Sequence, residues 1–207
     1  MDPQPVRLTG RYVRLEPLSR EQFDALVEVA AGRGIFQYFP MQIDSEAEVR
    51  GYLEYSLRGM EAGQNVTFTT ISLADGRPVG GTSFLAIDRA NRKLEIGGTW
   101  LAPEWQRTAC NTEAKYLQMR HAFEDLSAVR VEFKTDSLNE KSRAALLRIG
   151  AREEGTMRNH MIVQPSGRHR HSVYFSVIDS EWPAVKASLE ERLGQRSPPT
   201  RESGAAP

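Results

Sequence analysis

The order of the predicted strands and helices is the feature that most constrains the fold of this chain. Two helices follow an opening pair of strands, three strands come next, and strands then alternate with helices toward the C-terminus. Strands that bunch before one helix and alternate with helices after it are typical of a single layered sheet. We therefore expect an α+β fold with a mixed, mostly antiparallel sheet and helices on both faces.

Hydroxyl residues mark three of the helix starts. Ser19, Ser45 and Ser137 each stand three residues before a Gln or Glu, a spacing that lets two side chains satisfy free backbone amides at a helix start. Apolar residues at helical spacing follow each of them. Two further helices are predicted over about Thr112 to Leu126 and about Pro183 to Leu193.

Apolar runs with strand-like spacing predict the strands between these helices. The runs are Val6–Leu8, Val13–Leu15, Val66–Leu73, Val79–Ile87, Leu94–Leu101, Val129–Thr135, Thr156–Val163 and Ser172–Ile178. Asp75 and Gly76 separate the third run from the fourth and are a strong signal for a tight hairpin turn.

Length and composition fit one globular domain. The chain has 207 residues, of which 40% are hydrophobic and 26% charged, and this is enough to bury a sizeable core. We expect a single domain over residues 6–194 and a flexible N-terminus over residues 1–5. A disordered tail is expected over residues 195–207, where no apolar residue is larger than alanine.

Charge and cysteine content argue against several classes of function. The 27 Lys and Arg residues balance the 27 Asp and Glu residues, so the basic excess of a nucleic-acid-binding protein is missing. No apolar run reaches 18 residues, so we expect no membrane partner. The single cysteine, Cys110, cannot form an internal disulfide, and this fits the reducing cytoplasm.

A strand, a short loop and a helix start follow one another in the middle of the chain. The strand is Leu94–Leu101, residues 102–111 form the loop, and Thr112 opens the helix. Free amides at a helix start, together with the positive end of the helix dipole, can hold a phosphate group. Many αβ proteins have such a turn, so the spacing alone leaves an ordinary connection as the alternative.

Several motifs in this order resemble the GNAT acetyltransferase superfamily. Residues 106–111 are similar to its pyrophosphate loop, Gln/Arg-x-x-Gly-x-Gly/Ala, at the start of the third helix. The opening at residues 8–18, the Glu-Ile-Gly strand at residues 95–97 and the Trp-Leu-x-Pro turn at residues 100–103 resemble the branch with the ribosomal-protein N-terminal (RimJ/RimL-like) acetyltransferases. Residues 139–142 look like the asparagine-serine helix of that branch.

The resemblance implies the GNAT fold and a cytoplasmic enzyme that moves acetyl from acetyl-CoA directly to a primary amine. The amine belongs to a protein N-terminus or to a small molecule. The residues that the resemblance assigns to the cofactor are Trp100, Leu101, Gln106, Arg107, Thr108, Ala109, Asn111, Thr112, Asn139 and Ser142. Ala109, Asn111 and Leu146 depart from the family pattern, so the alternative is a non-catalytic acyl-CoA-binding or interaction protein.

Glu95 and Ser142 are the candidate catalytic residues. Glu95 is a carboxylate in an apolar strand, so it is the candidate base for the amine, acting through water, with a structural ion pair or a surface position as the alternative. Ser142 lies one helical turn after Asn139 and is the candidate contact to the sulfur, with a solvated helix start as the alternative. Gly97 and Gly98 suit a bulge, or else simple sheet curvature.

The acceptor side is less defined by the sequence. Phe36, Tyr38 and Phe39 follow the first helix, where the resemblance places the acceptor wall, and a hydrophobic cover over the core is the alternative. His169 and His171 are the nearest histidine pair, but flanking arginines oppose a cation, so we expect no metal. The apolar strands near the C-terminus are compatible with a homodimer.

Overall fold

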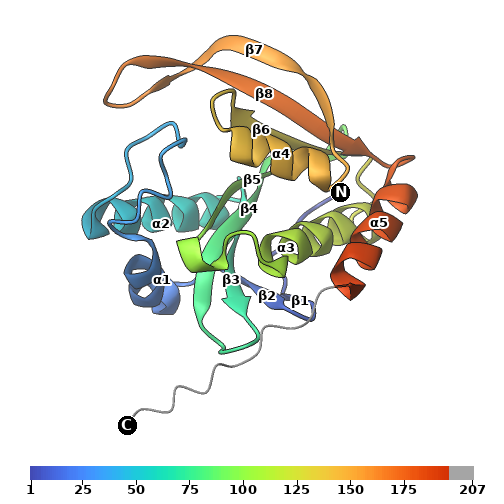
Figure 1. The fold of residues 1–207 in the computed structure, drawn as a ribbon, viewed down its shortest axis with the longest axis horizontal. Coiled ribbons are helices and arrows are strands. Elements are labelled where there is room, and N and C mark those ends of the chain that lie inside the picture. The colour runs from blue at the N-terminus through green and yellow to red at the C-terminus, as the bar shows by residue number, and fades with distance from the viewer. Residues whose placement is uncertain (196–207) are drawn as a thin grey trace.

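A single eight-stranded sheet organises residues 1–195, which are the residues that this computed structural model describes (Figure 1). The strands are β1 (Leu8–Thr9), β2 (Val13–Pro17), β3 (Val66–Ser72), β4 (Pro78–Asp88), β5 (Lys93–Leu101), β6 (Arg130–Asp136), β7 (Arg152–Val163) and β8 (Arg168–Ile178). They lie in the order β1-β2-β3-β4-β5-β6-β8-β7. Only β5 and β6 pair in parallel, so the prediction of a mixed, mostly antiparallel sheet is confirmed.

The helices begin close to the predicted caps, with one exception. They are α1 (Phe23–Ala30), α2 (Glu46–Glu61), α3 (Ala109–Arg120), α4 (Glu140–Arg148) and α5 (Trp182–Gly194). Ser45 caps α2, and its hydroxyl accepts a hydrogen bond from the Glu48 amide. The box at Ser19 opens a single 3-10 turn that leads into α1.

The prediction that Ser137 caps the next helix is wrong. Asn139 caps α4 instead, because its side-chain oxygen accepts from the Ser142 amide at 3.1 Å. A turn held by Asp136, which bonds to the amides of Leu138 and Asn139, precedes the helix and leaves Ser137 outside it. The predicted tail falls on residues 196–207, outside the described residues, apart from Gln195, whose amide closes the last turn of α5.

Helices cover both faces of the sheet, as predicted. On one face, α3, α4 and α5 pack against side chains such as Leu94, Phe133 and Phe175. On the other face, α1 and α2 form a second apolar cluster that includes Trp100 of β5. Alternate residues of a strand point to opposite faces, so the two clusters are the two faces of one sheet.

A β-bulge in β5 explains how Trp100 reaches the second face. The pairing with β4 shifts by one residue between Gly81–Trp100 and Ser83–Gly97. Gly98 lies within this step with a φ of 58°, a conformation that favours glycine. The extra residue reverses the alternation, so Ile96 faces α3 and Trp100 faces α2. The predicted bulge at Gly97 and Gly98 is thus confirmed.

The parallel strands β5 and β6 separate soon after they begin to pair. Their register covers only Lys93, Leu94 and Glu95 of β5. Beyond Glu95, β5 continues through the bulge to Leu101 and β6 continues to Asp136 without pairing to it. The edge of β5 beyond Glu95 is therefore unpaired on the side of β6, and α3 starts just after the far end of this strand.

The long strands β7 and β8 form a hairpin that arches away from the rest of the sheet (Figure 1). The loop over residues 31–45, between α1 and α2, touches the tip of this hairpin. The Gln164 amide donates to the Pro40 carbonyl at 3.0 Å, and the Arg170 guanidinium donates to the Tyr38 carbonyl at 3.2 Å. These hydrogen bonds connect the 31–45 loop to the β7–β8 hairpin.

In residues 1–195, none of the helices combines the length and the apolar character that a membrane span requires.

Candidate active site

The start of α3 is built as a capped helix terminus. The Thr108 hydroxyl accepts from the Cys110 amide at 3.2 Å and donates to the Trp105 carbonyl at 2.7 Å. The helix therefore begins at Ala109, three residues before the predicted start at Thr112, and Ala109 and Asn111 belong to its first turn rather than to the loop. The predicted start was wrong because Thr108 was not recognised as a cap. Threonine caps a helix well even without an acidic partner three residues later.

The loop before α3 is fastened to the end of β5. The Gln106 side chain donates to the Leu101 carbonyl at 3.0 Å. Arg107 carries the left-handed backbone conformation of this loop, with a φ of 64°, and its side chain is exposed. Ala109 stands where the family pattern has glycine, and it belongs to the helix without a positive φ, so this alanine causes no backbone strain.

The first turn of α3 suits an anion by its charge. It holds no acidic side chain, whereas α2 has Glu46 and Glu48 in its first turn. Glu113 points away from the helix start and binds the β1–β2 hairpin. Free amides at the start of a helix attract negative charge when no carboxylate of the chain occupies them. Asn111 and Thr112 lie half-buried beside this position.

Glu95 lies on the sheet face opposite Leu94 and Ile96, just before the bulge. Only 5% of its surface is exposed, and its carboxylate pairs with the Lys134 ammonium at 3.1 Å. It is therefore buried in an ion pair, which the sequence left open as an alternative, and it does not lie at the surface. A side chain at Gly97 would meet the Glu95 carboxylate, so this glycine leaves the carboxylate its space.

Tyr52 of α2 is a functional candidate that the sequence did not suggest. Its hydroxyl lies close to the bulge, because a side chain on Gly98 would come within 3.1 Å of it. Burial raises the pKa of Tyr52 to about 12, so the phenol stays protonated and can donate a hydrogen bond. A small cavity beneath the bulge is lined by Tyr52, Gly98 and Trp100. No spacing in the sequence links α2 to β5.

The aromatic residues after α1 divide between core and surface. Phe36 is 3% exposed, and its ring centre lies 5.3 Å from that of Trp100 and 5.9 Å from that of Tyr52. The hydrophobic-cover interpretation thus holds for Phe36, and the ring of Trp100 lies in the same cluster. Phe39 and Tyr38 are half-buried, and Phe39 packs edge-on against Phe36.

Asn139 and Ser142 meet through the helix cap described above. The cap occupies the side-chain oxygen of Asn139, and this favours its role at the helix end. Ser142 is half-buried, and its hydroxyl has no hydrogen-bond partner within residues 1–195, so its role at the sulfur stays a prediction. Leu146 is buried in the core between α4 and the sheet.

Lys115 of α3 is buried behind the bulge. Its ammonium donates to the hydroxyls of Thr99 at 2.5 Å and Thr82 at 3.2 Å, and these two hydroxyls also bond to each other at 2.8 Å. Burial lowers the pKa of Lys115 to about 7, while the charge of Glu95 acts in the opposite direction. Sequence reasoning could not find this position, because a lysine on a helix is normally solvated.

Neither the cysteine nor the histidines suggest other chemistry. Burial raises the pKa of Cys110, which keeps its thiol protonated and a poor nucleophile. No group of three or more His, Cys, Asp or Glu within residues 1–195 is placed to hold a metal ion. A metal-free mechanism stays a prediction.

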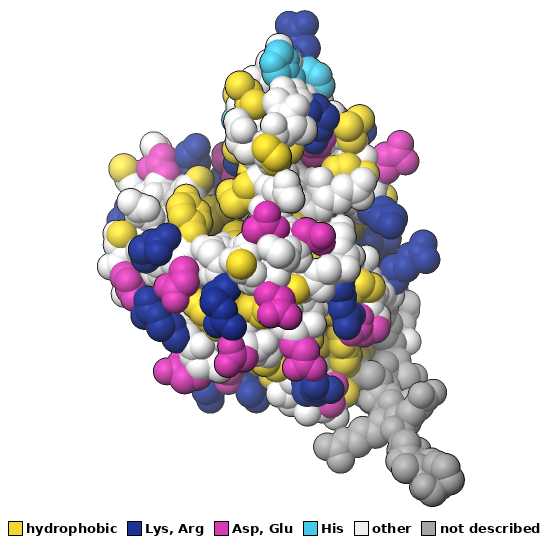
Figure 2. Space-filling model, turned by 90° about the vertical axis from the view of Figure 1, so that its left-hand side faces the viewer, with side chains coloured by type: hydrophobic (Ala, Val, Ile, Leu, Met, Phe, Trp, Pro, Cys, Tyr) yellow, Lys and Arg dark blue, Asp and Glu magenta, His cyan; other side chains and the backbone are white. Residues whose placement is uncertain are grey.

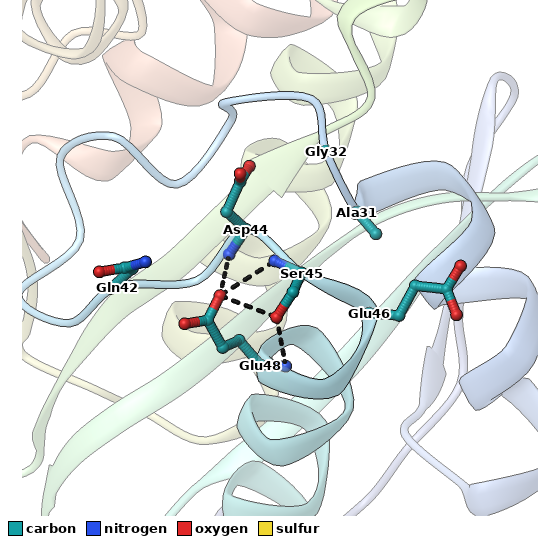
Figure 3. Close-up of a pocket in the computed structure, with 7 residues that line it drawn as sticks. All are labelled: Ala31, Gly32, Gln42, Asp44, Ser45, Glu46 and Glu48. Carbon is teal, nitrogen blue, oxygen red and sulfur yellow. Dashed lines mark hydrogen bonds between the residues drawn. The ribbon is translucent and has the colours of Figure 1, made fainter.

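A separate open depression lies at the start of α2 (Figure 3). Asp44, Glu46 and Glu48 line it, and the Glu48 carboxylate is occupied by the amides of Asp44 and Ser45 (Figure 3). This depression has the opposite charge to a phosphate site, so it is not part of the candidate active site.

The chain belongs to the GNAT acetyltransferase family. The family model described as an acetyltransferase (GNAT) domain matches residues 13–152, which include β5, the start of α3 and α4.

Particular relatives support this assignment. The chain is 38% identical over 130 residues to YdaF of Bacillus subtilis (strain 168), which is named as a provisional ribosomal N-acetyltransferase. That match covers 63% of this chain and 65% of the relative, slightly less than two thirds of its length. A GCN5-related N-acetyltransferase from Brucella melitensis has 33% identity, a TM-score of 0.85, and coverage of 93% of this chain and 87% of its own.

A third similar structure is RimJ of Mycobacterium smegmatis, solved in complex with CoA-disulfide. It covers 91% of this chain and 95% of its own, with a TM-score of 0.76 and 22% identity. At this identity the likeness shows a shared fold.

Proposed function

We propose that this protein transfers acetyl from acetyl-CoA to a primary amine. The observation that carries the proposal is the combination of an acid-free helix start at α3 with the unpaired edge of β5 beside it. A nucleotide thioester needs an anion site for its diphosphate and an amide-rich edge for its arm. Both features lie within the segment that matches the GNAT family, and the RimJ relative binds a CoA derivative.

The diphosphate is proposed to bind at the first turn of α3. The amides of Ala109 and Asn111 and the positive end of the helix dipole attract it, and the exposed Arg107 adds a positive charge. Gln106 and Thr108 act through the loop, because their side chains are bonded to the carbonyls of Leu101 and Trp105. Trp100 and Leu101 contribute backbone rather than side chains, since both side chains are buried. Thr112 and Asn139 are retained as proposed contacts.

Glu95 is the proposed base for the acceptor amine. Removal of the ammonium proton, through a water molecule, leaves a nitrogen lone pair that attacks the thioester carbon. The new C–N bond forms and the C–S bond breaks. The nitrogen releases its second proton to water, and the departing sulfur takes up a proton from the Ser142 hydroxyl, the proposed donor, which regains a proton from water. The phenol of Tyr52 is proposed to donate a hydrogen bond near the bulge, where the oxyanion forms.

Cofactor binding and turnover test the proposal together. Calorimetry with acetyl-CoA should give a binding signal, and a thiol-release assay with a broad amine panel should detect free CoA. Binding without release would favour the alternative of a non-catalytic acyl-CoA-binding protein. No binding at millimolar acetyl-CoA would reject both functions.

Replacement of the proposed base separates chemistry from binding. The variant Glu95→Gln should lower kcat by about 100-fold or more, the usual range for a lost general base, with acetyl-CoA affinity almost unchanged. Glu132→Gln is the matched control, because Glu132 faces the register position of Glu95 on β6 and has its own partners, Arg130 and Lys93. An equal loss in both variants, or none in Glu95→Gln, would remove Glu95 from the mechanism.

The proposal extends to the location of the protein in the cell and to the class of acceptor. We propose a cytoplasmic enzyme whose acceptor is a protein N-terminus or a small amine, with no nucleic-acid or membrane partner. The homodimer is likewise retained as a proposal. Size-exclusion chromatography with light scattering tests the dimer directly.

A further inference from the structure

The face of the sheet that includes Glu95 carries a ladder of charged side chains. In β6 and β8 the apolar residues of the core, such as Phe133 and Phe175, alternate with polar residues that point to the opposite face. The register of β6 with β8 then places Lys134 opposite Tyr174, and Asp136 opposite Ser172. Arg170 follows on the same face of β8, two residues before Ser172. Figure 2 views the molecule from the side of the hairpin tip and shows basic and histidine side chains at the top of the projecting β7–β8 hairpin.

Most of these charges are neutralised by a neighbour. Lys134 pairs with Glu95 at 3.1 Å, and Arg168 pairs with the fully buried Asp136 at 2.5 Å. Arg130, at the other end of β6, pairs with Glu132 at 2.8 Å. Ion pairs of this kind reduce the cost of removing charge from water.

Arg170 is the exception among the buried charged side chains on this face within residues 1–195. It is 5% exposed, and its one hydrogen bond goes to the Tyr38 carbonyl at 3.2 Å. Its buried Nε has no partner. A guanidinium has five N–H donors and normally meets carboxylates when buried, so the present contacts leave most of its binding capacity unused.

The surroundings of Arg170 have an excess of positive charge. Burial is the largest cause that lowers the pKa of Arg170, and the charges of Asp136 and Glu95 act against it. Burial, followed by the charges of Lys134 and Arg170, lowers the pKa of the neighbouring His160. With His160 neutral, the cations Lys134, Arg168 and Arg170 face the carboxylates Glu95 and Asp136. This group therefore carries one more positive than negative charge.

We propose that Arg170 binds a carboxylate of the acceptor, so that the substrate is a primary amine that also carries a carboxylate group. This inference rests on the proposed function and names the substrate class of the same site. The carboxylate lies against the guanidinium of Arg170, and the amine lies toward Glu95 on β5. Free amino acids and peptides with an acidic residue near the N-terminus share this chemistry, and the experiment distinguishes them.

A carboxylate fits this position better than a phosphate does. The planar fork of a guanidinium matches the two oxygens of a carboxylate with two parallel hydrogen bonds. A single negative charge balances the group, whereas a dianion would be repelled by Glu95 and Asp136, which lie on the same face.

Matched acceptors in which an amide replaces the carboxylate test the proposal. Glycine is compared with glycinamide, β-alanine with β-alaninamide, and Ala-Asp peptides with Ala-Asn peptides, in the thiol-release assay with acetyl-CoA. We expect kcat/KM to favour the carboxylate in at least one pair by about tenfold or more, as one charged hydrogen bond provides. The pair that shows the preference identifies the acceptor as a free amino acid or as an acidic peptide.

Two variants assign that preference to Arg170. Arg170→Gln should raise KM for the carboxylate acceptor by about tenfold and remove its preference over the amide acceptor. Arg158→Gln, at an exposed arginine on the same hairpin, should keep the preference. Arg170→Lys keeps the charge without the planar fork and should retain part of it. A preference that survives in Arg170→Gln, or is absent from the unmodified protein, overturns the proposal.

Product analogues give a readout that does not depend on turnover. Calorimetry compares N-acetylglycine with N-acetylglycinamide, and an N-acetyl Ala-Asp peptide with its Asn counterpart, in the unmodified protein and in Arg170→Gln. Tighter binding of an acid, lost in Arg170→Gln, supports the carboxylate site even if no acceptor of the panel releases CoA, a result that would count against the proposed function alone. CoA release from neutral amines, with equal binding of acid and amide, would reject the carboxylate site and leave the proposed function intact.

Discussion

Two charged side chains of α3 are buried, although lysines and glutamates on helices normally face water. Lys115 points to the sheet behind the bulge, and Glu113 points to the first hairpin. The two buried charges are stabilised by different hydrogen-bond partners. Glu113 accepts three backbone hydrogen bonds, whereas Lys115 is bonded to neutral hydroxyls. The lysine therefore keeps much of the free-energy cost of a buried charge.

Stability should rise with pH because of Lys115. Its folded-state pKa of about 7 lies below the ordinary value of 10.5, so the folded protein loses this proton first. Between these two values the unfolded chain binds more protons, and the free energy of unfolding increases with pH, by roughly 3 kcal/mol from pH 7 to pH 9.5. Urea unfolding of the protein and of Lys115→Met at both pH values measures this contribution as a difference.

The methionine variant should show much less of this rise. The hydroxyls of Thr82 and Thr99 stay paired with each other, and a buried charge is replaced by an apolar chain of similar length, so Lys115→Met should be at least as stable as the unmodified protein at pH 7. Parallel pH profiles for the two proteins would show that Lys115 is not the titrating group.

Single residues of the site were predictable to different degrees. Glu95 could be found because a carboxylate in an apolar strand is unusual in the sequence itself. Lys115 and Arg170 could not, since their partners lie on other elements and depend on strand register and helix rotation. The Lys134 partner of Glu95 was missed for the same reason, because the sequence does not show that β6 follows β5 in parallel.

At the level of elements, the bulge in β5 joins fold and site. It turns Trp100 toward α2, brings Gly98 under the Tyr52 hydroxyl and ends the regular part of the strand where the thioester is proposed to lie. Two adjacent glycines signalled it in the sequence. The start of α3 was predicted less well, because Thr108 caps it without the acidic residue that completes a capping box.

The conformation of Gly98 predicts opposite effects for two glycine-to-alanine changes. Gly98→Ala should lower the free energy of unfolding by about 1–2 kcal/mol, because φ is 58° and the new methyl group would lie 3.1 Å from the Tyr52 oxygen. Gly51→Ala, in the interior of α2 with open space around it, should raise the free energy of unfolding by about 0.5–1 kcal/mol. Thermal and urea unfolding of both variants checks the two signs.

Turnover separates the bulge from general stability. If the bulge positions the thioester, Gly98→Ala should also lower kcat at a temperature where the variant is fully folded. The same kcat as in Gly51→Ala would show that the bulge contributes to the fold alone.

Across the whole molecule, the N-terminal hairpin is tied to the helix that starts the proposed anion site. The Glu113 carboxylate accepts from the amides of Arg11, Tyr12 and Val13 at 2.8, 2.6 and 2.7 Å. Gly10 permits this approach, because any side chain there would collide with the carboxylate. The order of elements predicted the hairpin and the helix, but it gave no indication of this link, which joins residues about 100 positions apart.

Loss of this link should weaken the fold as a unit. Glu113→Gln replaces one acceptor oxygen with an amide donor that faces backbone N–H groups, and we expect a loss of about 3 kcal/mol in urea unfolding, as for a broken set of charged hydrogen bonds. Glu190→Gln is the control, because Glu190 accepts a single bond from Tyr116 at the surface and should change stability by less than about 0.5 kcal/mol. Hydrogen exchange then locates the effect: faster exchange of the Tyr12 and Val13 amides with the rest of the sheet protected would indicate local detachment of the hairpin. A uniform increase would indicate that hairpin and helix unfold together, and an unchanged variant would contradict the link.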